Sequence, residues 1–121
     1  MKKSYIKELF PDMRYAPYPY GERNYKGFDV RETTCMDVWL VARLYECFRH
    51  FQDVVSDTID LEYDQILVDD KWLTQRECID CMVMDCKVIL QSDEFREHDI
   101  RNAAKNDLFK ILSACYWSMW W

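Results

Sequence analysis

Glycine and proline are scarce in this chain of 121 residues, which has two Gly and three Pro, all before residue 28. Beyond that point few residues force a turn. Because a sandwich of many short strands needs such residues at its turns, the composition argues against one. Half of the residues are apolar and 16% are aromatic, so helices joined by short polar links can bury a core without disulfides or a metal.

Long apolar runs are absent as well. No stretch reaches the ~18 apolar residues of a membrane span, and the N-terminus lacks the apolar run of a signal peptide, since it reads MKKSYIKE. We therefore expect a cytoplasmic protein with no membrane partner. In that compartment the six Cys are expected to be reduced thiols in the core.

Residue patterns that build catalytic sites are also missing. The chain has two His, which lie far apart in the sequence. It contains no Gly-rich phosphate loop and no G-x-S-x-G motif. We expect neither an enzyme nor a cofactor.

Positive charge is in deficit after the first part of the chain. Residues 1–31 hold seven of the 16 Lys and Arg and four of the 22 Asp and Glu, so the later residues hold nine and eighteen. The net charge of −6 argues against direct binding to nucleic acid, whose phosphates need cations. A protein partner with a basic surface is the better expectation.

The stretch 34–57 has the apolar period of a long amphipathic helix. Thr33 or Thr34 can cap its N-terminus, and Asp37 in the first turn favours the helix dipole. The predicted inward face comprises Leu40, Val41, Leu44, Cys47, Phe48, Phe51, Val54 and Val55. The predicted outward face comprises Arg43, Glu46, Arg49, His50 and Asp53.

Three further helices are predicted along the chain. Residues 4–10 fit a short helix, the capping box Thr74–Glu77 starts one that runs to about residue 90, and Asp99 caps the last one. The predicted core side of the last helix comprises Ile100, Ala104, Leu108, Ile111, Leu112, Cys115 and Met119.

The segment 58–64 alternates as a strand would, but its apolar spacing also fits a helix, and we favour the helix because its neighbours are helical. The predicted fold is therefore one all-α domain over 1–121 with four or five helices. Residues 1–31 form an N-terminal helix and an extended aromatic, Pro-containing arm, and 34–121 form the helical body. A short strand near 58–64 stays open as the alternative.

Tryptophans at the C-terminus are the first candidate partner-binding residues. Helical spacing places Trp117 and Trp121 opposite the core stripe of the last helix and Trp120 beside it. Trp39 similarly falls on the polar side of its helix. Exposed Trp residues are frequent interface anchors. The alternative is that the N-terminal aromatic arm covers them.

An acidic run is the second candidate. It comprises Asp57, Asp60, Glu62, Asp64, Asp69 and Asp70, with no Lys or Arg among them. An EF-hand that began at Asp60 would need Gly and Glu where Gln65 and Lys71 stand, so calcium is not expected. The run is either a solvated face or a phosphate-like surface that occupies a basic nucleic-acid-binding groove on another protein.

A cysteine cluster is the third candidate. Cys78 and Cys81 form a C-x-x-C pair, which Cys47 and His50 of the central helix can complete to a Cys3His zinc site. Against this, His50 falls on the polar side of its helix, and the pair lies too far inside its own helix to gain a low thiol pKa from the N-terminus. We expect core thiols, and we expect Asp85 on the same face to pair with an Arg or a Tyr hydroxyl.

These features predict a non-enzymatic interaction protein that docks an aromatic and acidic surface onto another protein. One concrete version is a phage-type inhibitor that binds a host nucleic-acid-binding enzyme, as nucleic-acid mimics and anti-CRISPR-like proteins do. Two alternatives stay open. One is a small zinc or thiol protein that uses Cys78 and Cys81, and the other is a homo-oligomeric subunit of a larger assembly.

Overall fold

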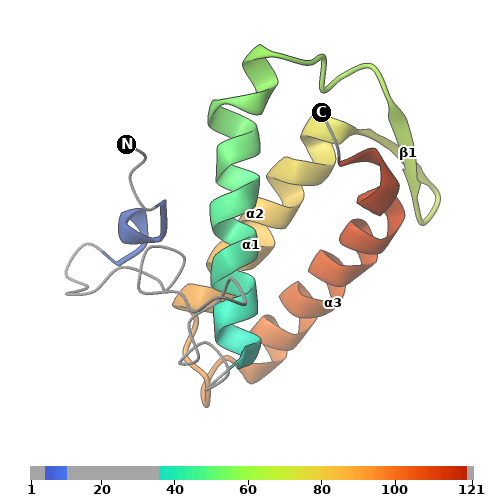
Figure 1. The fold of residues 1–121 in the computed structure, drawn as a ribbon. Coiled ribbons are helices and arrows are strands. Elements are labelled where there is room, and N and C mark those ends of the chain that lie inside the picture. The colour runs from blue at the N-terminus through green and yellow to red at the C-terminus, as the bar shows by residue number, and fades with distance from the viewer. Residues whose placement is uncertain (1–4, 11–35, 120–121) are drawn as a thin grey trace.

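The computed structural model describes residues 5–10 and 36–119, and in this part the chain forms three α-helices and one hairpin (Figure 1). The helices are α1 (Met36–Asp53), α2 (Gln75–Gln91) and α3 (His98–Cys115). The strands are β1 (Gln65–Val68) and β2 (Lys71–Thr74), and the short 3-10 turns are η1 (Tyr5–Glu8), η4 (Val55–Asp57) and η5 (Tyr116–Ser118). The protein is therefore mainly helical, and the prediction of an all-α fold with four or five helices is wrong. The predicted arm lies outside the described residues.

Helix α2 is the centre of the helical body, because both α1 and α3 pack along it (Figure 1). The buried faces meet in one core that includes Tyr45 of α1, Ile79 and Met82 of α2, and Leu108 of α3, each at most 1% exposed. Apolar residues three and four positions apart supply these faces, so packing on α2 fixes the positions of the other two helices.

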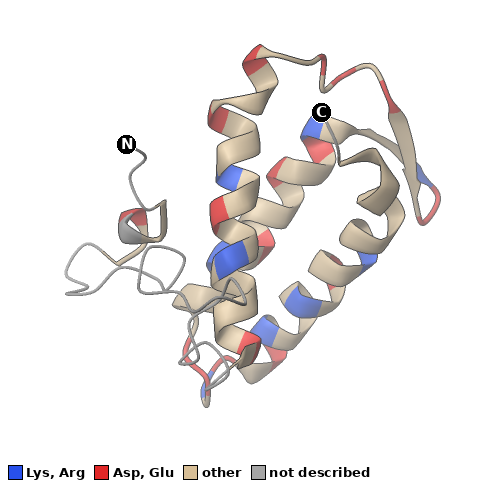
Figure 2. Ribbon diagram, in the orientation of Figure 1, with Lys and Arg blue, Asp and Glu red and all other residues tan. Residues whose placement is uncertain are grey.

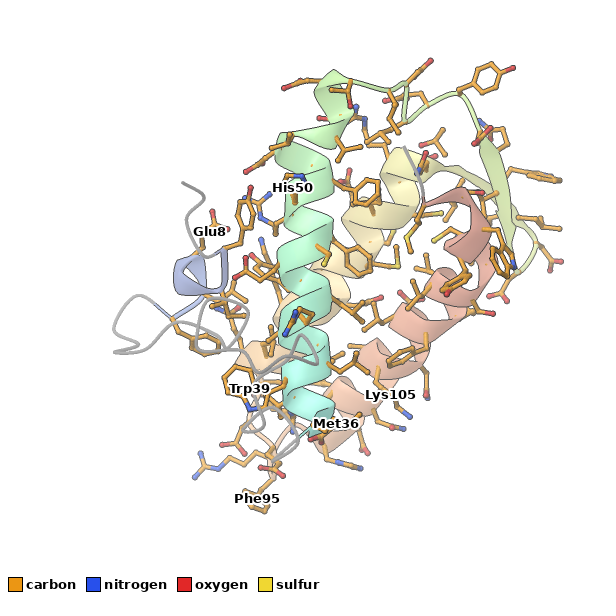
Figure 3. All side chains as sticks on the ribbon, viewed as in Figure 1. Glu8, Met36, Trp39, His50, Phe95 and Lys105 are labelled. Atoms are coloured by element: carbon orange, nitrogen blue, oxygen red, sulfur yellow. The ribbon has the colours of Figure 1, made fainter. Side chains whose placement is uncertain are left out.

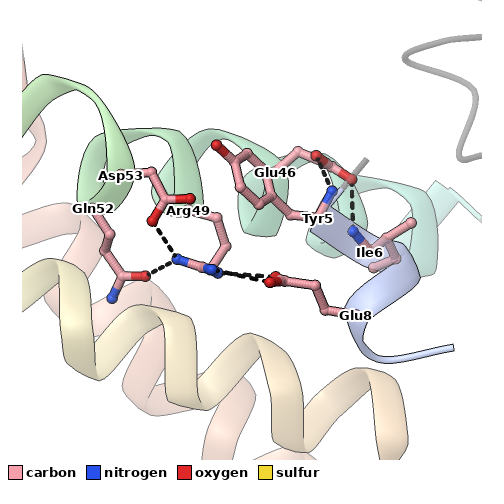
Figure 4. Close-up of polar contacts among 7 residues, drawn as sticks. All are labelled: Tyr5, Ile6, Glu8, Glu46, Arg49, Gln52 and Asp53. Carbon is pink, nitrogen blue, oxygen red and sulfur yellow. Dashed lines mark hydrogen bonds and ion pairs between the residues drawn. The ribbon is translucent and has the colours of Figure 1, made fainter. Parts of the chain in front are cut away.

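The inward face of α1 differs in part from the predicted one. Val41 and Phe48 are buried as predicted, but Leu40 is 44% exposed, and Glu46, predicted to face outward, is only 6% exposed. Glu46 is buried because η1 packs against the polar side of α1 (Figure 4). Both oxygens of the Glu46 carboxylate accept hydrogen bonds, from the backbone N–H groups of Tyr5 at 2.9 Å and Ile6 at 2.8 Å. These two bonds compensate for the burial of its charge.

A guanidinium reinforces the same contact. Arg49 donates from Nε and Nη2 to the two carboxylate oxygens of Glu8, each at 3.2 Å (Figure 4). It also lies over the ring of Tyr5, 5.0 Å from the centroid, where a cation–π contact is favourable. The N-terminal turn is thus held to α1 by charged groups that the amphipathic pattern assigns to solvent.

The segment after α1 corrects the helix favoured for 58–64. In the structure these residues form turns and bends, and the strand alternation begins only at β1. The antiparallel register places Ile66 opposite Leu73 and Leu67 opposite Trp72. Between the strands, Asp69 has a φ of 53°, which Asp tolerates better than most residues and which suits a tight hairpin turn.

The other two helices follow their sequence signals closely. In the predicted capping box, Thr74 Oγ1 accepts from the N–H of Glu77 at 3.1 Å, and the N–H of Thr74 donates to Glu77 at 2.8 Å. Helix α3 starts at His98, with Glu97 rather than Asp99 at the N-cap position. Its predicted core residues Ala104, Leu108, Ile111 and Cys115 are buried. Ile100, in its first turn, is 53% exposed because a helix end has fewer neighbours.

Candidate functional site at the hairpin end

Most of the predicted partner-binding residues gather at one end of the molecule. This end, called the hairpin end below, comprises η4, the link 58–64, the β1–β2 hairpin and η5 (Figure 1). In the ribbon of Figure 2, the red positions of Asp and Glu recur along the link and at the hairpin turn. All of the predicted acidic residues are exposed, namely Asp57, Asp60, Glu62, Asp64, Asp69 and Asp70. The fold therefore collects charges that the sequence shows only as a run.

The outward face of the hairpin carries a cross-strand apolar pair. Ile66 and Val68 point into the core, so Leu67 and its partner Trp72 face solvent, 50% and 63% exposed. Tyr63, just before the hairpin, is 81% exposed. Large exposed apolar side chains surrounded by polar groups are typical of protein-binding surfaces.

Two ion pairs hold the acidic segments to the helices behind them. Lys110 of α3 donates to Asp69 in the hairpin turn at 2.8 Å, and Arg76 of α2 donates to Glu62 in the link at 2.8 Å. The N–H of Arg76 also donates to the carbonyl of Leu61 at 3.0 Å, and Leu61 is buried. Because these contacts already hold the link and the hairpin turn in place, the two segments would lose less conformational entropy on binding a partner.

The C-terminal turn η5 lies beside the start of α2. Gln75, itself buried, donates from Nε2 to the carbonyl of Ser118 at 2.6 Å. Trp117 is 85% exposed and packs edge-on against Tyr116, with ring centroids 4.9 Å apart. The structure therefore places Trp117 at the hairpin end as an exposed ring.

The other predicted tryptophans are not part of this surface as described. Trp39 is half-buried against the core, toward the other end of α1 (Figure 3). Trp120 and Trp121 lie outside the described residues. Conversely, sequence reasoning missed Leu67 and Trp72. The signal that could have found them is the two-residue Asp69-Asp70 link between two short apolar runs, which is typical of a hairpin.

The cysteine candidates are separated by the fold. Cys78 is fully buried, whereas Cys81 and Cys47 are exposed. In the described part of the chain, no three His, Cys, Asp or Glu side chains are placed to hold a metal ion. Cys78 instead contacts Cys115 of α3, and the hydrogen bond between the two thiols raises the pKa of Cys78 and lowers the pKa of Cys115. A buried thiol of raised pKa is a poor metal ligand and a poor nucleophile.

Among the described residues, no Arg or Tyr hydroxyl forms the hydrogen bond or ion pair expected for Asp85, although the charge of Lys110 favours its ionised form. Asp85 faces Asp107 across the α2–α3 contact, and burial together with Asp107 raises the pKa of Asp85 to about 8. Its Oδ2 is buried and accepts no hydrogen bond from a described residue. Protonation turns the Asp85 carboxyl into a hydrogen-bond donor, so near neutral pH the folded protein keeps a proton on Asp85.

A scan against models of known families finds no match for the chain, and neither does a search of curated proteins or of solved structures. Over residues 5–10 and 36–119, no helix has the length and apolar character needed to cross a bilayer.

Proposed function

We propose that the protein is a non-enzymatic interaction module whose hairpin end docks onto a basic surface of another protein. The observation that carries this proposal is the exposed Leu67–Trp72 pair, which projects from a surface rich in exposed carboxylates. An apolar centre that excludes water and a charged rim are the two parts of a typical protein interface.

The charge of the rim selects the kind of partner. Exposed carboxylates on one end of the molecule attract a basic surface and speed its approach. A nucleic-acid-binding groove is such a surface, because its cations are spaced to neutralise phosphates. The concrete form of the proposal is an inhibitor that covers this groove, with Asp60, Glu62 and Asp64 in place of phosphates and Trp72 as the apolar anchor.

The test is a capture from nuclease-treated lysate, followed by titration of the retained protein with purified wild type and variants. For Trp72→Ala we expect a loss of affinity of at least about tenfold, because truncation of a central aromatic anchor typically costs about 2 kcal/mol or more. For the triple variant Asp60→Asn/Glu62→Gln/Asp64→Asn we expect slower association and a weaker dependence on salt.

The matched control is Met84→Ala, since Met84 is a 56%-exposed apolar side chain on α2, away from the hairpin end. It should bind as wild type does, and circular dichroism should show all the variants folded. Equal affinities for Trp72→Ala and Met84→Ala would contradict the proposal, as would a captured protein whose binding does not depend on salt.

Self-association through the same surface is disfavoured by its charge. Two copies docked hairpin to hairpin would bring carboxylates of one sign together, which costs free energy. We therefore expect the mass of a single chain over a wide range of concentrations in analytical ultracentrifugation. A dimer that Trp72→Ala dissociates would instead support the homo-oligomeric subunit.

A further inference from the structure

A surface groove of about 320 Å³ lies where the N-terminal half of α1 faces α3, and it extends along α3 from His98 to Phe109. It is called the α1–α3 groove below. Figure 3 labels Met36 of α1 and Lys105 of α3, the two helices that form its sides. Five apolar side chains line it: Val38, Leu40 and Val41 of α1, Ile89 of α2 and Phe109 of α3.

The groove is deep at its centre and open at its rim. Val41 and Ile89, the deepest apolar residues, are 5% and 7% exposed. Leu40 is 44% exposed and Phe109 is 37% exposed, so apolar surface rises on both walls. Because α2 lies beneath while α1 and α3 form the sides, three helices that pack for stability also leave this hollow.

One wall of the groove is basic, although the whole chain has a net charge of −6. His98, Arg101 and Lys105 lie on one face of α3, and Asp37 is the one carboxylate among the described lining residues. Nε of Arg101 donates to the carbonyl of Ile89 at 3.2 Å, which holds the guanidinium near the end of α2. Lys105 is exposed and forms no ion pair with any described residue. Both groups can donate to an anion at the rim.

We propose that the α1–α3 groove binds a small amphiphilic carboxylate, whose apolar tail contacts Val41 and Ile89 and whose carboxylate contacts Arg101 and Lys105. Small-molecule sites are mostly apolar hollows of roughly 300–1,000 Å³ with a few polar groups that fix orientation. The groove has this volume and this arrangement. This site is separate from the hairpin end and has the opposite charge.

The experiment is a titration of the full-length, isotope-labelled protein with decanoate below its micelle-forming concentration, followed by NMR. We expect saturable shifts of amides in residues 38–41 and 98–109 and none in the hairpin. Decyltrimethylammonium has the same tail with a cationic head, and it should bind much more weakly because Arg101 and Lys105 repel it.

The decisive variant is Lys105→Gln, which removes an exposed charge and does not threaten the fold. We expect it to weaken decanoate binding about tenfold, as loss of a charge-assisted hydrogen bond does, and Lys105→Gln/Arg101→Gln to weaken it further. Arg96→Gln, which removes an exposed charge outside the groove, should leave binding unchanged.

Three results would overturn the proposal. Shifts that grow linearly without saturation would show no site. Equal affinity of Lys105→Gln and Arg96→Gln for decanoate would show that the basic wall does not contact the carboxylate. Equal binding of the two amphiphiles would show unspecific apolar adhesion. None of these results depends on whether the hairpin end captures a protein, so the two proposals fail separately.

Discussion

The hairpin end and the α1–α3 groove are two separate regions on the same helices, and they differ in shape and in charge. The hairpin end projects outward and carries exposed carboxylates around the Leu67–Trp72 pair. The groove is concave, with three basic side chains on one wall. The net charge of −6 describes only the first of these regions. The total charge of a protein therefore does not show that one part of its surface has the opposite sign.

The two regions also differ in what holds them in place. The walls of the groove are helices that pack on α2 over many apolar contacts. The hairpin is a two-stranded ribbon, which is marginally stable alone. It is held in place by the packing of Ile66 and Val68 into the core and by the ion pair between Lys110 and Asp69. Substitutions can thus remove both regions together or disturb one of them alone.

The largest effect is expected for Leu108→Ala, because both regions share the core. Leu108 is fully buried on α3, and truncation of such a Leu lowers the free energy of unfolding by about 2–5 kcal/mol. Urea unfolding monitored by circular dichroism measures it. Phe109→Ala is the matched control, since Phe109 is the next residue on α3 and 37% exposed, and it should cost clearly less. Equal losses for the two variants would contradict this assignment of the core.

A smaller effect of opposite sign, an increase in the free energy of unfolding, is expected for Asp85→Asn on α2. The folded pKa of Asp85 is about 8 against a usual value of 3.8. Between these two values the folded protein holds a proton that the unfolded chain has lost, so stability falls as pH rises. Asn removes this dependence. At pH 8 we expect the free energy of unfolding of Asp85→Asn to exceed that of wild type by about 1–2 kcal/mol. This is less than the whole pKa shift implies, because the carboxyl is only partly buried.

The measurement is the free energy of unfolding of wild type and Asp85→Asn at pH 5 and pH 8. The difference between the proteins should grow toward pH 8. Asp80→Asn is the control, since Asp80 is an exposed carboxylate on the same helix. A difference that is constant over this pH range would show that the folded protein does not hold an extra proton on Asp85.

Sequence alone predicts well the elements that carry their own local signals. The capping box at Thr74 and Glu77 fixes the start of α2 because its bonds are local. The stripe from Ala104 to Cys115 predicts the buried face of α3 because this face packs mainly on α2. In both cases the physical cause lies within a few residues of its effect.

Contacts between distant segments were beyond such reasoning. Glu46 is charged and was predicted to face solvent. In the structure η1, which lies some forty residues earlier in the chain, covers it and donates two backbone hydrogen bonds to its carboxylate. The alternating pattern of 58–64 did not show which segment, if any, it would pair with. In the structure the hairpin starts only at Gln65. The acidic run could be predicted as exposed, whereas the Leu67–Trp72 pair depends on register and the α1–α3 groove on how three helices diverge.

The smallest effect, and the sharpest separation of the two regions, is expected for Lys110→Met. Lys110 is the tie from α3 to the hairpin turn, and its ion pair with Asp69 raises the pKa of Lys110. Exposed ion pairs contribute little, so global stability should hardly change. Amide exchange in β1 and β2 should nevertheless become faster by roughly a factor of two to five, since local opening is easier without the tie.

Lys105→Met is the control because it removes the same charge from the same helix without a described partner. It should leave exchange in the hairpin unchanged and weaken decanoate binding in the groove, whereas Lys110→Met should do the reverse. Such a crossed result requires two independent regions, since a general change in charge or helix stability would move both measurements in both variants. Faster hairpin exchange in Lys105→Met would mean instead that the two regions are coupled through α3.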